Sequence, residues 1–207
     1  MLTLLIGLLA GLSYSFGISS ICRGKYQPSI YSRVVWLLIA VNCFIGVLAL
    51  NNSPGTLILT GISVIGSLVM LISALKYSVH IFGVTEIICT ILLAISIVLW
   101  ITLNAPLVNV MLGLVAHFIG GIPSIVKAIK KSDSENMLFW LFFALASALA
   151  FIQADKTQFD KFIFSLYHMV FDGGMTLLAT RQYFRYIRPL TVKSPIKVDE
   201  KNDNINL

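Results

Sequence analysis

The stretch Gly17–Trp36, "GISSICRGKYQPSIYSRVVW", has a counterpart further along the chain in Gly121–Trp140, "GIPSIVKAIKKSDSENMLFW". Both stretches open with Gly-Ile-x-Ser-Ile and end in Trp followed by Leu, at a constant offset of 104 residues. A basic residue stands two positions after the second Ile in each copy, Arg23 in the first and Lys127 in the second. The chain therefore contains one junction twice, and the surrounding sequence shows what that junction connects.

The composition of the chain indicates an integral membrane protein. Of its 207 residues, 57% are hydrophobic and 12% are charged, and the mean hydropathy is +0.90, whereas soluble domains carry about 25% charged residues. The formal charge of +6 does not indicate a nucleic-acid-binding face, because the basic residues stand between long apolar runs, as in cytoplasmic loops. Cys22, Cys43 and Cys89 lack the spacing of a metal or redox motif, so we expect no metal site and no cofactor.

Seven segments have the length and composition of membrane-spanning helices, which need about 20 mainly apolar residues. The first has no basic residues before it and is long for a signal peptide, so we expect it to remain in the mature protein. Asn, Pro and Gly mark tight turns after the second and fourth segments. The predicted spans are Leu2–Ile21, Val34–Leu50, Thr56–Leu75, Ile81–Leu103, Leu107–Ala128, Met137–Ile152 and Phe162–Ala179.

The basic residues predict the orientation of these spans. They gather in the first, third and fifth connections and after the last span, whereas the other connections contain only Lys156 and Lys161, beside Asp155 and Asp160. Because basic loops stay in the cytoplasm, the sequence predicts a multi-pass protein of the cell membrane with its N-terminus outside. Its C-terminus would then be cytoplasmic, and the polar tail 190–207 is predicted to be disordered. The basic residues of the first, third and fifth connections are Arg23, Lys25, Arg33, Lys76, Lys127, Lys130 and Lys131.

The offset of 104 residues carries the first three predicted helices onto the last three. We therefore predict an all-α fold with a 3+1+3 parallel repeat. It consists of a three-helix unit (1–77), a linker helix (78–105), a second three-helix unit (106–189) and the tail. Units related in this way by an axis along the membrane normal form one class of transporter, in which the solute binds between them near the middle of the bilayer.

The 3+1+3 plan and the second junction resemble the PQ-loop and SWEET-like superfamily, in which a Pro-containing helix end precedes a basic loop and a second helix. The first junction is similar to that of a group of uncharacterised bacterial seven-helix membrane proteins. The residues that match their pattern are Arg23, Gly24, Lys25, Pro28 and Trp36. The resemblance implies transport of a small polar solute, such as a sugar, by rocking of the two units. The Pro-Gln pair itself is absent: Pro123-Ser124 stands in the second copy and Ser19-Ser20 in the first.

Polar residues inside the predicted spans are the candidates for a binding site. An ionisable group at the bilayer centre costs roughly 2.5–3.5 kcal/mol, so such groups face a cavity or a partner. Asp172 and His168 lie one turn apart on one face of the last helix, and His117 precedes a bendable Gly-Gly-x-Pro segment. For each candidate the alternative is a structural hydrogen bond between helices. The predicted solute-binding residues are Asp172, His168, His117, Asn42, Ser13 and Tyr14.

Three further residues have simpler interpretations. Glu86 is expected to reach the membrane interface or to pair with Lys76 or His80. Trp36 and Trp140 stand at the predicted cytoplasmic starts of two helices, which is typical of the aromatic belt of membrane proteins.

Two classes of function remain. The first is a facilitator or proton-linked carrier of a small polar solute. The alternative is a non-transporting receptor, assembly factor or structural subunit, which the missing Pro of the first unit favours. An enzyme is not expected, because the sequence has no nucleophile–base pair, metal cluster or phosphate loop. A retinal protein is excluded, since Lys161 lies only at the edge of the last helix. The expected partners are the lipid bilayer and the solute but not nucleic acid, with a homo-oligomer left open.

Overall fold

The computed structural model describes residues 1–24, 29–77, 83–131 and 135–187 of the chain. Within these ranges the protein is all-helical, with seven α-helices and no strand. The tail 190–207, and Lys25, Pro28 and His80, on which sequence predictions were made, lie outside the described residues. The helices are α1 (Leu2–Cys22), α2 (Ile30–Ala49), α3 (Pro54–Tyr77), α4 (Val84–Leu103), α5 (Pro106–Lys130), α6 (Met137–Gln153) and α7 (Phe159–Ile187).

Six of the seven helices are long and apolar enough to cross a membrane, whereas α6, with 17 residues, is apolar but shorter. The protein is therefore a helical, multi-pass membrane protein, as its composition predicts. Large apolar side chains such as Ile91, Ile101 and Leu177 point outward and are more than half exposed, which in a membrane places them against lipid.

Local sequence signals explain where several helices begin and end. Pro54 and Pro106 open α3 and α5, at positions where the missing N–H of proline costs nothing. Asn51 and Asn104 follow α2 and α4 in left-handed backbone conformations, with φ of 48° and 47°, which Asn tolerates better than most residues. The side chain of Asn136 caps α6 by accepting from two backbone N–H groups at its start.

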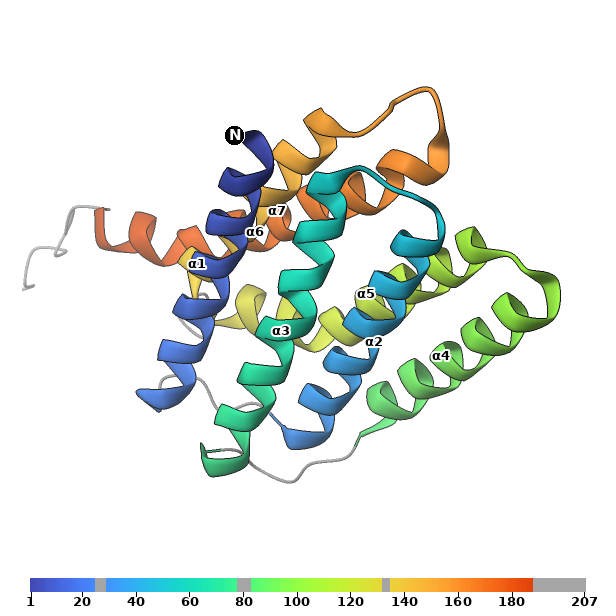
Figure 1. Ribbon diagram of the computed structural model, residues 1–207. Helices are drawn as coiled ribbons and strands as arrows, with labels where there is room; N and C mark the ends of the chain where they lie inside the picture. Colours follow the sequence, from blue (N-terminus) through green and yellow to red (C-terminus); the bar gives the residue numbers. More distant parts are fainter. Residues whose placement is uncertain (25–28, 78–82, 132–134, 188–207) are drawn as a thin grey trace, which may run out of the picture.

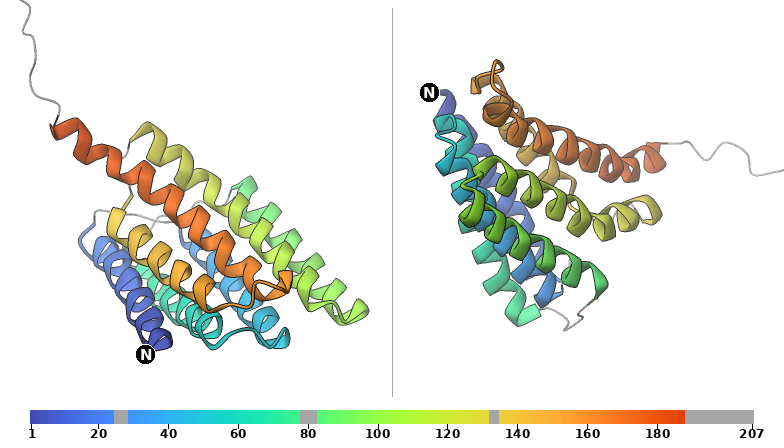
Figure 2. Two further views of the ribbon diagram at one scale, coloured as in Figure 1. Left: turned by 90° about the horizontal axis from the view of Figure 1, so that it is seen from above. Right: turned by 90° about the vertical axis from the view of Figure 1, so that its right-hand side faces the viewer.

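Six helices pack in a closed ring in the order α1, α3, α2, α5, α7 and α6. We call α1–α3 the first group, α5–α7 the second group, and the boundary between them the seam. In the first group α3 packs against both α1 and α2 and lies between them (Figure 1). In the second group α7 packs against both α5 and α6, and Figure 2 (left) shows it between them. Across the seam α1 packs against α6, and α2 against α5, while α4 lies outside against α5 and α2.

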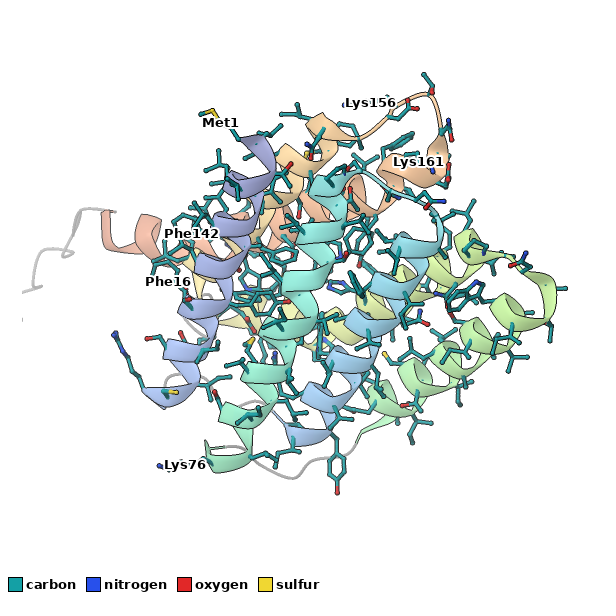
Figure 3. All side chains as sticks on the ribbon, viewed as in Figure 1. Met1, Phe16, Lys76, Phe142, Lys156 and Lys161 are labelled. Atoms are coloured by element: carbon teal, nitrogen blue, oxygen red, sulfur yellow. The ribbon has the colours of Figure 1, made fainter. Side chains whose placement is uncertain are left out.

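Hydrogen bonds near the ends of the helices mark the two ends of the bundle. At the N-terminal end Gln153 donates to Thr3 at 3.0 Å, and Asn52 donates to the carbonyl of Asp160 at 2.9 Å. At the opposite end Asn136 donates to the hydroxyl of Ser20 at 2.6 Å. In Figure 3 Met1, Lys156 and Lys161 lie at the N-terminal end and Lys76 at the other. That other end is called the basic end below, because Arg23, Arg33, Lys76, Lys127, Lys130 and Lys131 belong to it.

Glycines allow the helices that carry the repeated junction to pack closely. A Cβ atom on Gly17 would lie 2.9 Å from the ring of Phe139, and one on Gly121 would lie 2.5 Å from the ring of Phe171. Real Cβ contacts are longer than this, so a side chain at either position would push a ring away. The two glycines of the repeat are therefore explained by helix packing.

Candidate functional site

A cavity of about 90 Å³ lies along the seam between the two groups of helices. This volume has room for several water molecules or part of a small solute. Its walls come from α1, α2 and α3 on one side and α5, α6 and α7 on the other, and no described residue of α4 lines it. Six aromatic residues supply much of its surface: Tyr14, Trp36, Phe139, Trp140, Phe143 and Phe164.

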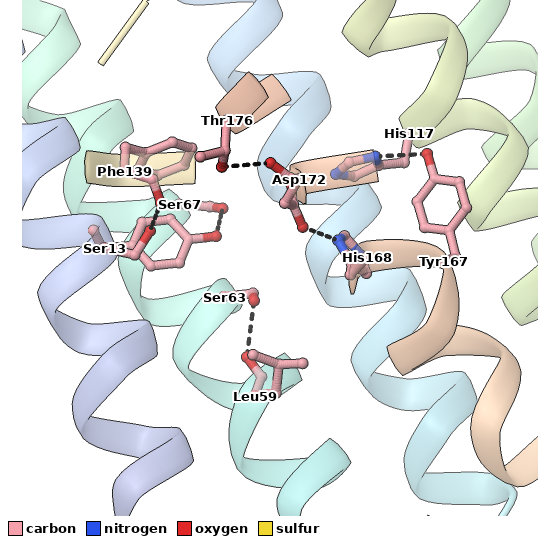
Figure 4. Close-up of polar contacts among 11 residues, drawn as sticks. Ser13, Leu59, Ser63, Ser67, His117, Phe139, Tyr167, His168, Asp172 and Thr176 are labelled. Atoms are coloured by element: carbon pink, nitrogen blue, oxygen red, sulfur yellow. Dashed lines mark hydrogen bonds and ion pairs between the residues drawn. The ribbon is translucent and has the colours of Figure 1, made fainter. Parts of the chain in front are cut away.

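A buried histidine–aspartate pair on α7 faces this cavity. His168 Nδ1 lies 3.1 Å from Asp172 Oδ2, and the two side chains are 7% and 3% exposed. The predicted contact between these residues is therefore confirmed, while their role in binding stays a prediction. The α-helical spacing of four residues brings them together on one face, and the hydroxyl of Thr176 donates to the backbone carbonyl of Asp172 at 2.8 Å (Figure 4).

His117 joins this pair from α5. Its Nδ1 lies 3.0 Å from the hydroxyl of Tyr167. Its ring stands edge to face against the rings of His168 and Trp36, with centroids 4.6 Å and 4.5 Å away. His117 thus contacts His168 and Tyr167. The three residues and Asp172 form one polar cluster that spans α5 and α7.

Hydroxyl groups line the opposite wall of the cavity. The hydroxyl of Tyr14 on α1 lies 3.5 Å from that of Ser67 on α3. The ring of Tyr14 fits there because residue 66 is glycine: a Cβ on Gly66 would lie 2.2 Å from the ring carbon Cγ. Ser63 also lines this wall, although its hydroxyl donates to the carbonyl of Leu59 within its own helix at 2.8 Å.

Two of the six predicted binding residues lie outside the cavity. Ser13 is fully buried, and its hydroxyl donates to the carbonyl of Phe139 at 2.6 Å, which joins α1 to α6. Asn42 donates to Ser96 on α4 at 3.3 Å and accepts at its backbone carbonyl from Asn109 on α5 at 3.1 Å. Both residues hold helices together, which is the alternative that the sequence left open for them.

The part of the cavity toward the basic end contains a carboxylate that the sequence did not reveal. Glu135 lies just before α6 and is only 7% exposed. Trp140 Nε1 donates to its Oε2 at 3.2 Å, whereas Oε1 has no hydrogen-bond partner. Burial raises the pKa of Glu135, and the bond from Trp140, the charges of Arg33 and Lys127 and the hydroxyl of Ser124 oppose this effect.

The belt interpretation of the two tryptophans is wrong. Trp140 is 6% exposed, and Trp36 packs against His117, and both line the cavity. Both side chains turn toward the seam, where Trp140 is buried and Trp36 is half-buried. Glu86 lies at the start of α4, where it accepts from the backbone N–H of Gly83 at 2.9 Å and from the hydroxyl of Ser32.

The chemistry of the cavity is that of a binding site for a polar molecule. It offers two carboxylates, imidazoles and hydroxyls within a largely aromatic wall, an arrangement typical of pockets for small molecules. Among the described residues no three His, Cys, Asp or Glu side chains gather closely enough to hold a metal ion.

Comparisons with protein-family models, curated proteins and solved structures gave no match to this chain. The class of the protein therefore rests on its own sequence and fold. It is a multi-pass helical membrane protein with a polar cavity enclosed by two groups of three helices.

Proposed function

We propose that this protein is a membrane transporter that carries a small polar solute, such as a sugar, through the cavity between α1–α3 and α5–α7. One observation carries the proposal: three helices from each group enclose a cavity that contains buried Asp172, His168 and His117. Polar groups at this depth lower the stability of a membrane protein, so a cavity that concentrates them indicates a solute or proton pathway.

The packing order of the helices supports the internal repeat. The first group has the order α1–α3–α2, and the second has the equivalent order α5–α7–α6. The two contacts across the seam are also equivalent under the repeat. If α1 corresponds to α5 and α2 to α6, the contact of α1 with α6 corresponds to the contact of α5 with α2. The resemblance to the PQ-loop and SWEET-like superfamily is part of this proposal, since that plan has two such units.

Repeated residues line the shared cavity from both sides. Ser20 and Ser124 are equivalent at the offset of 104 residues, and so are Trp36 and Trp140, and all four belong to its wall. If the repeated junction served only to end a helix, its two copies would not need to line the same cavity. This favours a site formed jointly by the two units, as in transporters built from parallel repeats.

Rocking of the two units would open the cavity alternately at its two ends. At the N-terminal end the hydroxyls of Thr56 on α3 and Ser165 on α7 lie 3.1 Å apart across the seam. At the basic end Asn136 bonds to Ser20 at 2.6 Å. Each contact closes one end, and the solute passes when one breaks while the other holds. Pro123 inside α5 gives the second unit a place to bend.

Two steps test the proposal: thermal unfolding of the purified protein with sugars, amino acids, nucleosides and organic acids, followed by uptake into proteoliposomes. A solute at 100 times its dissociation constant adds about 2.7 kcal/mol of stability, and Asp172→Asn should abolish the shift and the uptake. Asp160→Asn is the matched control, because Asp160 lies on the same helix at the N-terminal end, beside Lys161 at 3.6 Å. If no solute stabilises the protein or enters the vesicles, the proposal fails and the non-transporting alternative takes its place.

A further inference from the structure

We infer that Glu135 binds a positively charged ammonium group of the solute at the basic end of the cavity. This inference rests on the proposed function and narrows it to solutes that carry a protonated amine. The observation behind it is a buried carboxylate oxygen, Glu135 Oε1, that has no hydrogen-bond partner and lies in the wall of the cavity.

An unpartnered carboxylate oxygen is unusual in a folded protein. Nearly all buried polar atoms have a partner, and leaving one without costs roughly 1–3 kcal/mol, more when the group is charged. Neither of the ion pairs that join two described residues, Lys161–Asp160 and His168–Asp172, includes Glu135. A ligand that donates hydrogen bonds and carries positive charge supplies the partner that Glu135 Oε1 lacks among the described residues.

The walls around Glu135 suit an ammonium group. Trp140 holds Oε2 at 3.2 Å and so fixes the carboxylate. The ring of Phe139 packs against that of Trp140 with centroids 4.9 Å apart, and Phe139 and Trp36 also line the cavity. Aromatic faces attract cations, and the attraction grows where water is excluded. Asp172, the second carboxylate of the cavity, has His168 as its partner, so Glu135 offers the more open acceptor.

The positive groups near Glu135 narrow the class of solute. Arg33 belongs to the wall of the cavity and approaches the sulfur of Met70 at 3.8 Å, and the charge of Lys127 also acts on Glu135. These charges keep the site from being uniformly negative. A solute with an ammonium group beside a carboxylate therefore fits at least as well as a simple amine, and the test compares the two.

The test uses pairs of solutes that differ by an amine: alanine with lactate, ethanolamine with ethylene glycol, and glucosamine with glucose. The dissociation constant of each is measured by thermal shift on the full chain. We expect the amine member of a pair to bind about tenfold more tightly to the wild type, since a hydrogen bond to a charged group contributes roughly 1.5–3 kcal/mol. Tighter binding of alanine than of ethanolamine identifies a zwitterionic solute, and tighter binding of ethanolamine identifies a simple amine.

Glu135→Gln should remove the preference for amines while keeping an oxygen that accepts from Trp140. The matched control is Glu86→Gln, which removes the same charge at the start of α4, outside the cavity wall. If the amine-free solutes bind as tightly as the amines, or if Glu135→Gln keeps the preference, the inference is wrong while the transporter proposal stands. If no solute binds to the wild type, the transporter proposal itself fails.

Discussion

Glu135 shows how burial of one side chain can set function against stability. Its carboxylate is almost fully covered, and burial raises its pKa above the ordinary value. A raised pKa means that folding favours the protonated form, so this contribution to stability is present at low pH and is lost as the pH rises through the folded-state pKa. At neutral pH the ionised carboxylate therefore lowers the stability of the folded protein. This is expected of a residue that serves to bind a ligand.

The variant Glu135→Gln should accordingly unfold at a higher temperature than the wild type at neutral pH without solute. The gain should shrink as the pH falls and disappear below the ordinary pKa of glutamate, where both residues are neutral. Thermal unfolding across this pH range measures the difference, with Glu86→Gln as the control for lost net charge. A variant that is less stable than the wild type at neutral pH would show that the carboxylate is already stabilised.

The sequence predicted part of this site, for reasons that differ from residue to residue. His168 and Asp172 stand out because they interrupt an apolar span at helical spacing, and their contact follows from that spacing alone. Glu135 belongs to the polar run "KKSDSEN", where acids are usually exposed, and it becomes buried only when the helices pack around it. Trp140 was misread, since a residue's position along a span gives its depth but not the side that it faces.

A cluster of buried polar side chains attaches α4 to the rest of the bundle. Asn42 on α2, Ser96 on α4 and Asn109 on α5 are buried together. Ser96 donates to the side-chain oxygen of Asn109 at 2.5 Å, and Asn109 donates to the carbonyl of Asn42 at 3.1 Å. Because the outer face of α4 is mostly apolar and exposed, these bonds set its position.

Removal of the cluster's central side chain should loosen this helix. We expect Asn109→Ala to lower the free energy of unfolding by about 1–2 kcal/mol, the upper range for hydrogen bonds between membrane helices. Unfolding in mixed detergent measures the loss. Thr102→Ala is the control, since the hydroxyl of Thr102 bonds only to the carbonyl of Val98 in its own helix. Equal stability of both variants would contradict a role for the cluster.

The existence of the helices was predictable, whereas some of their limits were not. Long apolar runs, separated by turns of Asn, Pro and Gly or by charged loops, identify all seven, because a membrane demands continuous helices. The prediction started the second helix at Val34, but α2 begins at Ile30. Its first turn contains Ser32 and Arg33, whose polarity resembles a loop; in the fold Ser32 bonds to Glu86 and Arg33 reaches the cavity.

The basic end predicts the orientation of the whole molecule in the membrane. The structure groups the basic residues of the first, third and fifth connections at one end, and the positive-inside rule predicts that this end is cytoplasmic. Cys22 is exposed there, whereas Cys43 and Cys89 are buried. A membrane-impermeant thiol reagent should therefore label Cys22 in inverted vesicles but not in intact cells.

The control for this labelling is Thr157→Cys in a Cys22→Ser background, because residue 157 is exposed at the N-terminal end. It should react in intact cells. The opposite pattern for both positions would show that the protein has the reverse orientation in the membrane.

Transport by rocking requires the two groups of helices to move against each other along the seam. Two pairs of cysteines can lock it, each in the Cys22→Ser background: Thr56→Cys with Ser165→Cys at the N-terminal end, and Ser20→Cys with Asn136→Cys at the basic end. The hydroxyls of Thr56 and Ser165 lie 3.1 Å apart, and Asn136 Nδ2 lies 2.6 Å from the Ser20 hydroxyl. The two side chains of each pair therefore meet across the seam, as two cysteines must before a disulfide can form.

The measurement is proteoliposome uptake of the solute that stabilises the protein most, before and after reduction of each disulfide. We expect either lock to stop uptake and reduction to restore it, since each end must open once in every cycle. Oxidised proteins that transport as fast as the reduced ones would show that the seam does not move and that the protein does not transport by rocking.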